Sequence, residues 1–285
     1  MLKVSMGVLA MVTFLESQFE QQERRPLSLT DVRVDRIVAG EKNLFVVRDD
    51  LLLGGTKERA CVSFLENLGG SEDEEFVYAS PFCGFAQVAL ARSAQVLGQT
   101  SVVFAARDPH FDDLRMHTYS KLAESLGAKI VLCESLAEAH EQSVAYAAES
   151  GSYLVPLGFD HPEFRSALKA AIKTVWAKIE RSVGQPIRRL WLPVGSGTLA
   201  KCLREVIPPN VEMHLVNVNV LTESDSRIQA VMELPNTVYQ TAPESFNEAC
   251  EHMPEIPSNL HYDAKLWRFL SAEGEDGDLW WNVAR

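Results

Sequence analysis

The most constraining feature of the sequence is a regular alternation of short apolar runs with longer amphipathic stretches. Apolar runs of strand length lie at 76–80, 101–106, 129–133 and 152–157, and stretches of helical length separate them. Parallel strands need a long crossover, which is usually a helix, so this order predicts a parallel sheet flanked by helices. We therefore expect an α/β protein with open, twisted parallel sheets that carry helices on both faces.

The second half of the chain continues the same order with less regular spacing. A helix is expected at 162–179, strands at 190–194 and 213–220, a short helix at 263–270 and a last strand at 279–283. The proline-rich stretch 236–260 shows little periodicity and is expected to be irregular. The first 15 residues are too short and too interrupted by polar residues to span a bilayer, and we interpret them as an early strand or a loose tail.

Two segments are candidates for crossings between lobes. One is the acidic segment 71–75, and the other lies near 183–186. We expect a small substrate-side lobe at 71–160, inserted into a large cofactor-binding lobe made of 1–70 and 161–285. A ligand should then lie between the lobes at the carboxyl ends of strands.

Charge and cysteine usage exclude several classes of function. The formal net charge is -12, which disfavours strong binding to duplex DNA and to anionic membranes. The five cysteines are scattered without a CxxC pair, so the sequence predicts neither a disulfide framework nor a metal site. A reducing cytoplasmic location is the simplest expectation.

A glycine-rich turn joins the expected strand 190–194 to the next helix. It reads Gly195-Ser196-Gly197-Thr198, and a turn of this kind exposes backbone N–H groups at the positive end of a helix dipole. Taken alone, a structural turn and a phosphate-binding turn are equally good interpretations.

A second glycine turn carries a lysine. Lys57 follows Gly54-Gly55-Thr56 at the expected start of a helix, where a cation opposes the helix dipole. The alternative is a solvated surface lysine, but an amine in such a bend suits a Schiff base. A cofactor with a phosphate at one end and an aldehyde at the other would need both turns.

These motifs resemble the pyridoxal-phosphate enzymes of the tryptophan-synthase-β type, which have fold type II. The resemblance is greatest to aminocyclopropane-carboxylate deaminases and D-cysteine desulfhydrases. It implies that Lys57 forms the imine with pyridoxal 5'-phosphate and that the turn at 195–198 binds the phosphate. The segment Tyr262-Asp263-Ala264-Lys265 is similar to a C-terminal family motif, which implies that Tyr262 faces the substrate and Asp263 the pyridine nitrogen. The family also implies a homodimer.

The chain departs from the family in the loop expected to bind substrate. The family usually has Ser-Asn-His there, whereas this chain has Gly84, Phe85 and Ala86. Backbone N–H groups can still bind an anion at that helix start, but the side-chain contact is lost. The loop is more similar to divergent phage-encoded members, some of which elaborate thymine in DNA. The candidate substrate-binding residues are Ser80, Phe82, Cys83, Gly84, Phe85 and Gln87.

Several of these residues have a plain structural alternative. Asp263 could cap the helix that it begins, and Tyr262 could pack without contacting substrate. Cys83 could be a small buried hydrophobe. Asn282 could lie near the cofactor, or the strand with Trp280 and Trp281 could simply fill a core.

Three functions remain open from the sequence. The first is a lyase, deaminase or decarboxylase that performs carbanion chemistry on an amino-acid-like substrate. The second is a phage-type enzyme that processes an aminoacylated pyrimidine in DNA or in a nucleotide. The third is a protein that binds pyridoxal phosphate without catalysis.

Overall fold

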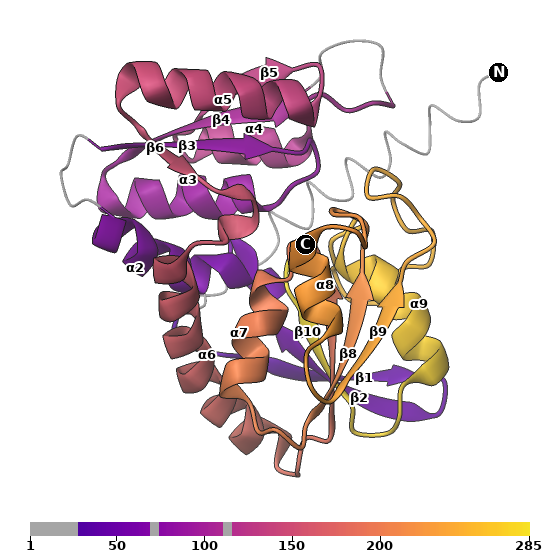
Figure 1. Cartoon of the computed structure of the whole chain (residues 1–285). Coiled ribbons are helices and arrows are strands. Elements are labelled where there is room, and N and C mark those ends of the chain that lie inside the picture. Colours follow the sequence, from indigo (N-terminus) through magenta and orange to yellow (C-terminus); the bar gives the residue numbers. More distant parts are fainter. Residues whose placement is uncertain (1–27, 69–73, 111–115) are drawn as a thin grey trace.

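The computed structural model describes residues 28–68, 74–110 and 116–285. The tail expected at 1–15 and most of the acidic segment 71–75 lie outside the described residues. Figure 1 shows two sheets, one above the other, with the C-terminus at the boundary between them.

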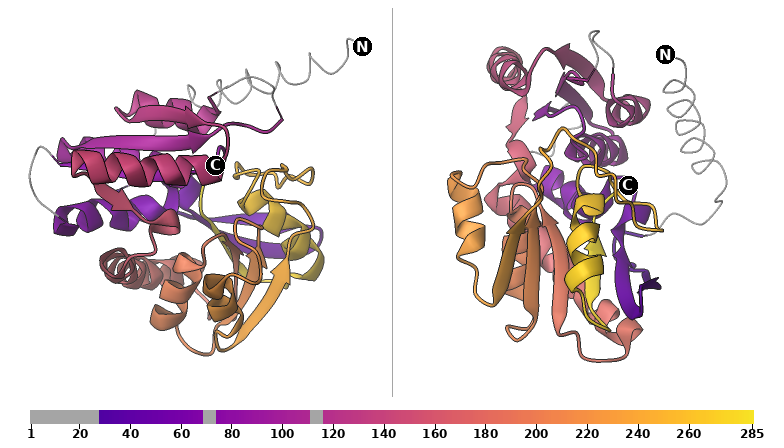
Figure 2. Two further views of the ribbon diagram at one scale, coloured as in Figure 1. Left: turned by 45° about the horizontal axis from the view of Figure 1, so that its top comes forward. Right: turned by 90° about the vertical axis from the view of Figure 1, so that its right-hand side faces the viewer.

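The smaller sheet has four parallel strands in the order β5-β4-β3-β6. Its strands are β3 (Glu75–Ser80), β4 (Thr100–Ala106), β5 (Lys129–Cys133) and β6 (Tyr153–Val155). Helix α5 (Leu136–Ser150) packs on one face, and α3 (Ala86–Leu97) and α4 (Thr118–Ser125) pack on the other. Figure 2 gives two further views of this arrangement. We call this sheet with its three helices the small lobe.

The larger sheet has six strands in the order β1-β2-β10-β7-β8-β9, and only the pair β1 and β2 is antiparallel. Its strands are β1 (Val34–Ala39), β2 (Lys42–Arg48), β7 (Arg189–Val194), β8 (Glu212–Asn217), β9 (Thr237–Thr241) and β10 (Leu279–Asn282). The helices around it are α2 (Glu58–Leu68), α6 (Pro162–Val183), α7 (Thr198–Val206), α8 (Ser226–Met232) and α9 (Asp263–Glu273). We call this assembly the large lobe.

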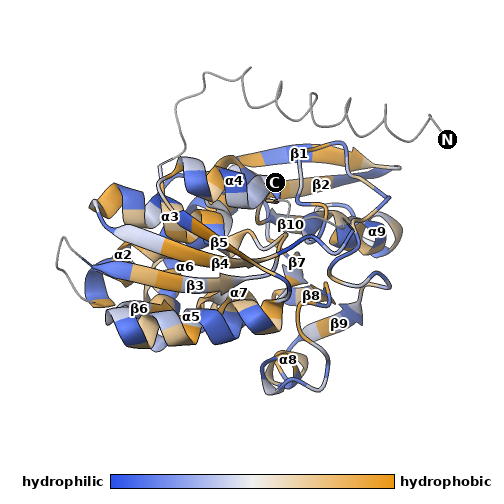
Figure 3. Ribbon diagram, turned by 90° about the horizontal axis from the view of Figure 1, so that it is seen from above, coloured by the Kyte–Doolittle hydropathy of each residue, from blue (hydrophilic) through white to orange (hydrophobic). Residues whose placement is uncertain are grey.

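Alternating side chains divide the core of the large lobe into two layers. Phe45 and Trp281 face α2, α6 and α7, whereas Val46 and Trp280 face α9. This is the period of two that a strand requires, and both layers are buried because helices cover both faces. Figure 3 shows hydrophobic residues along the strands of the smaller sheet and alternating hydrophilic and hydrophobic residues along the helices.

Helix α6 follows its sequence signals closely. His161 caps it by accepting a hydrogen bond from the N–H of Glu163, Pro162 occupies its first turn, and Gly184 ends it with a φ of 71°. Its apolar stripe, from Phe164 to Ile179, is buried.

The expected fold class is confirmed, and two local expectations were wrong. Residues 237–241 form strand β9 in a region expected to be irregular, because pairing with β8 compensates for a half-exposed sequence without an apolar run. Strand β8 ends at Asn217, before the expected residue 220, and Asn219 has a φ of 64° that no strand accommodates. Helix α4 begins at Thr118, with His117 as its N-cap.

The five cysteines are buried, free thiols. Within the described ranges, no three His, Cys, Asp or Glu side chains are grouped so that they could hold a metal ion. None of the helices described has both the length and the apolar character needed to cross a membrane.

Candidate functional site

A cavity lies between the two lobes, near the carboxyl ends of β3 and β7. Four separate segments bring predicted site residues to its wall: the Lys57 turn, the loop before α3, the turn before α7 and the start of α9. The predicted site residues that line it are Lys57, Gly84, Phe85, Gly195, Ser196, Gly197, Thr198 and Tyr262. Two turns that lie far apart in the sequence therefore face one space.

Lys57 ends a short 3-10 turn, and α2 begins at the next residue. Gly55 has a φ of 64°, and a Cβ there would lie 2.4 Å from the carbonyl oxygen of Val283, so the turn requires glycine. The Lys57 amine has no hydrogen-bond or ion-pair partner among the residues that the structure describes. Burial lowers its pKa to about 8, against a weaker opposing effect of Cys61. Lys57 is therefore a neutral amine far more often than a surface lysine is at neutral pH.

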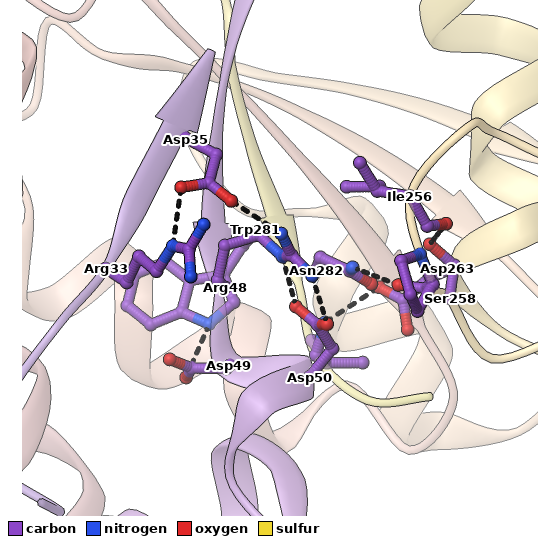
Figure 4. A network of polar contacts seen from close by, with 12 residues as sticks. Arg33, Asp35, Arg48, Asp49, Asp50, Ile256, Ser258, Asp263, Trp281 and Asn282 are labelled. Carbon is purple, nitrogen blue, oxygen red and sulfur yellow. Dashed lines mark hydrogen bonds and ion pairs between the residues drawn. The ribbon is translucent and has the colours of Figure 1, made fainter. Parts of the chain in front are cut away.

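A buried ion pair fixes the turn that carries Lys57. The Asp49 carboxylate accepts hydrogen bonds from Arg59 Nη2 at 2.6 Å and Arg59 Nε at 3.0 Å. It also accepts from Thr56 Oγ1 at 2.8 Å and Trp281 Nε1 at 3.0 Å. Figure 4 shows the Trp281 ring above Asp49, beside the separate ion pairs of Arg48 with Asp35 and Asp50. Thr56 is thereby held in place directly before Lys57.

The turn after β7 has the form of an anion-binding site. Gly197 has a φ of 80° and precedes the first residue of α7, Thr198, whose hydroxyl lies 3.0 Å from that of Ser196. Two close approaches require glycine in this turn and beside it. A Cβ on Gly195 would lie 2.7 Å from the Tyr262 hydroxyl, and a Cβ on Gly158 would lie 2.3 Å from Ser196. Gly158 lines the cavity as well, and the sequence analysis missed it.

Asp263 and Asn282 do not line the cavity, but both are buried next to residues that do. Asp263 Oδ1 accepts from the N–H of Val283 at 2.8 Å, whereas its Oδ2 has no partner in the described part of the chain. Burial, with a contribution from Asp50, raises the pKa of Asp263 well above its usual value. Asn282 Nδ2 donates to the carbonyl of Pro257 at 2.8 Å, and its Oδ1 is also without a partner there. The side chain of Asp263 does not cap α9.

The remaining predicted substrate-binding residues lie behind the wall of the cavity. Ser80 Oγ donates to the carbonyl of Pro81 at 2.9 Å. Gln87 Nε2 donates to the carbonyl of Gly84 at 2.8 Å and Gln87 Oε1 accepts from Ser120 Oγ at 2.9 Å.

Phe82 and Cys83 are also buried in that loop. Phe82 packs against the rings of His117 and His261, and burial strongly raises the pKa of the Cys83 thiol. A contact of Ser80, Phe82, Cys83 or Gln87 with substrate stays a prediction.

The chain was compared with known proteins at the levels of sequence and structure. No protein-family model matches the sequence, and no curated protein does either. Solved structures do match. An ACC deaminase homologue has a TM-score of 0.71 at 14% identity, covering 92% of this chain and 92% of that chain. A threonine deaminase from T.th. has a TM-score of 0.69 at 18% identity, covering 90% of this chain and 92% of that chain.

The apo form of Escherichia coli diaminopropionate ammonia lyase has a TM-score of 0.64 at 15% identity, covering 94% of this chain and 85% of that chain. At these identities the likeness shows the fold, which is fold type II of the pyridoxal-phosphate enzymes. The fold implied by the family resemblance is confirmed.

Proposed function

We propose that the protein is a pyridoxal-phosphate-dependent enzyme that acts on a small amine or amino acid, in the class of lyases and deaminases. One observation carries the proposal: an unpaired, desolvated lysine amine and a glycine-rich helix start line the same cavity. The fold supports it, because two of the structural neighbours are a diaminopropionate ammonia lyase and a threonine deaminase.

The residues present fit this cofactor. The Lys57 amine would hold the aldehyde carbon, and the N–H groups and hydroxyls of the turn at 195–198 would bind the phosphate. The unpaired Oδ2 of Asp263 is a suitable acceptor for the pyridine N–H, and a cation beside this carboxyl would favour its ionised form. When bound, pyridoxal phosphate supplies an electron sink for a carbanion next to the substrate nitrogen.

The protein's own groups would then bind substrate and move protons. Lys57, with a pKa near 8, is suited both to accept a proton from substrate and to return it. Burial raises the pKa of Tyr262 well above 10, so its hydroxyl stays protonated and acts as a donor. Phe85 and Pro81 present apolar surface to the cavity and exclude water there.

The reaction class is tested by incubating the holoprotein with single amino acids and amines and assaying ammonia and keto acids. We expect release from at least one of them. A protein that binds cofactor, releases neither product and shows no change in cofactor absorbance with any amine would instead be a non-catalytic binding protein. Decarboxylation would be detected as carbon dioxide in the same incubations.

A second substrate class has one observation in its favour. Among the described residues that line the cavity, Lys57 is the only one with a charged side chain, so none of them supplies a second cation to pair with a free carboxylate. An aminoacylated pyrimidine, in a nucleotide or in DNA, is the substrate that we propose as the alternative. The net charge of -12 disfavours duplex DNA. Consumption of the aminoacylated nucleoside but of no free amino acid would select this alternative.

The low pKa of Lys57 predicts how cofactor uptake depends on pH. Only the neutral amine attacks an aldehyde, so the rate of uptake by the apoprotein should rise about tenfold per pH unit below pH 8 and level off above it. A free lysine derivative, measured in parallel, should keep accelerating toward pH 10. Stopped-flow absorbance checks this, and a protein rate that follows the free amine up to pH 10 would refute the desolvated state of Lys57.

Replacing Gly197 with alanine should weaken phosphate binding. Its φ of 80° is unfavourable for alanine, and the new Cβ would lie 2.4 Å from Val231 Cγ2. We expect Gly197→Ala to lower the free energy of unfolding by more than about 1 kcal/mol and to weaken pyridoxal phosphate binding more than pyridoxal binding. Gly98→Ala is the matched control, because Gly98 has a φ of 69° with nothing within 4 Å. If both variants lost affinity for pyridoxal phosphate, relative to pyridoxal, by the same factor, the turn at 195–198 would not be the phosphate-binding site.

A further inference from the structure

The two lobes also meet at a polar contact that no motif of the sequence predicts. Tyr119 lies on α4 of the small lobe, and its hydroxyl oxygen is 2.9 Å from Nδ2 of Asn259, which precedes α9 in the large lobe. The Tyr119 ring packs edge-on against Phe85, with centroids 4.9 Å apart, and Phe85 lines the cavity. The contact therefore adjoins the proposed active site.

Asn259 is fixed in place by the large lobe. It is fully buried, its N–H donates to the carbonyl of Ala284 at 2.9 Å, and its carbonyl accepts from the N–H groups of Tyr262 and Ala264. Ala284 and Tyr262 both line the cavity. Asn259 is thus part of the turn that holds two residues of the cavity wall.

The side-chain amide of Asn259 can have only one orientation. Its Oδ1 accepts from the N–H of His261 at 3.0 Å. If Oδ1 and Nδ2 exchanged places, the amide NH2 group would face the His261 N–H, and both of these groups are donors. Nδ2 must then be the atom that faces Tyr119, and it can only donate. The Tyr119 oxygen is therefore the acceptor in this hydrogen bond.

This direction leaves the hydroxyl proton of Tyr119 free for another partner. None of the described residues accepts it. Burial strongly raises the pKa of Tyr119, so the group remains a phenol that donates. The side chain is only partly buried, and a phenol that is oriented by one neighbour and still has a proton to donate is suited to ligand binding.

We propose that Tyr119, oriented by Asn259, is a substrate-binding residue that donates a hydrogen bond to an acceptor oxygen of the amine substrate. The inference rests on the proposed function and deepens it. The neighbouring imidazoles set the chemistry of the acceptor. Burial lowers the pKa of His117 to about 4 and also lowers that of His261, so both rings are neutral at pH 7. The donor is thus a neutral phenol beside neutral rings, and either a carboxylate or a carbonyl oxygen can accept its hydrogen bond.

The test compares amines that differ in their oxygens. Holoprotein is prepared first, and its cofactor content is checked by borohydride fixation, so a protein that takes no cofactor counts against the proposed function alone. Alanine, alaninamide and isopropylamine are then titrated, and the change in cofactor absorbance gives their apparent dissociation constants. In Tyr119→Phe we expect the constant to rise about twofold to tenfold for a ligand whose oxygen accepts this bond and to stay unchanged for isopropylamine. Weakening for alaninamide identifies a carbonyl acceptor, and weakening for alanine alone identifies a carboxylate.

Two further variants separate this role from a structural one. Asn259→Asp supplies an acceptor in place of the amide donor, so it should divert the Tyr119 proton and weaken the same ligands as Tyr119→Phe does. Tyr153→Phe makes the same chemical change on β6 of the small lobe, away from the cavity wall, and should bind all three amines like the wild type. Equal affinities of the wild type and Tyr119→Phe for all three amines would overturn the inference. So would an equal loss for isopropylamine, because that would show a structural role.

Discussion

Lys57→Ala should abolish covalent capture of pyridoxal phosphate. The variant should lose the visible absorbance of the lysine-bound cofactor, retain no label after borohydride treatment, and lose any turnover by at least about a hundredfold. The reason is geometric as well as chemical. Lys57 is the only lysine that lines the cavity within the described chain. Its amine has no partner among the described residues, so no existing bond has to break before it reacts with the cofactor. Absorbance spectra of the purified proteins, together with cofactor retention on gel filtration, measure the change.

A second buried lysine provides the control for this variant. Lys265 is fully buried, burial lowers its pKa, and its Nζ donates to the carbonyl of Ser245 at 2.6 Å. Its amine is thus engaged in a structural bond, and Lys265 is not among the described residues that line the cavity. Lys265→Met should keep the colour and the fixed label, even if it lowers stability. Loss of label in Lys265→Met, together with its retention in Lys57→Ala, would show that Lys265 and not Lys57 binds the cofactor.

Asp49→Ala should have the largest effect on stability. The substitution leaves the Arg59 guanidinium, which is also fully buried, without its counter-ion, and it removes the acceptor for Thr56 and Trp281. Breaking a buried ion pair in this way costs about 3 to 5 kcal/mol of unfolding free energy. Urea unfolding followed by tryptophan fluorescence measures the loss.

The same substitution at an exposed aspartate provides the comparison. Asp276 accepts two hydrogen bonds from Asn43 at the surface, and Asp276→Ala should cost less than about 1 kcal/mol. Asp49 also fixes the turn before Lys57, so a folded Asp49→Ala variant should bind cofactor more weakly, whereas Asp276→Ala should not. Similar unfolding free energies for the two variants would show that the buried pair does not hold this turn.

Local motifs were the part of the site that could be predicted from the sequence. The Lys57 turn and the turn at 195–198 each carry their own glycines, so their form depends on neighbours within a few residues. Alternating apolar runs likewise indicated the parallel sheets, because burial on both faces leaves a continuous apolar strand. The sequence did not by itself show that the two turns face one cavity.

What the sequence did not show depends on contacts between distant residues. Tyr119 and Asn259 are 140 positions apart, and nothing around either residue indicates the other. The approach of Gly158 to Ser196 is likewise set by the meeting of two lobes. The edge strand β9 escaped notice because most of its positions are half-exposed and few of its residues are apolar. The hairpin of β1 and β2 was not predicted either, although β2 carries the buried apolar run 44–47.

Peptide mapping of the wild-type protein after borohydride reduction in the presence of pyridoxal phosphate tests the central claim most directly. A modified Lys57 resists trypsin, so the account predicts that the label lies in one peptide running from Asp49 to Arg59, with Lys57 left uncleaved inside it. A label found on another lysine, or on no peptide at all, would contradict the account.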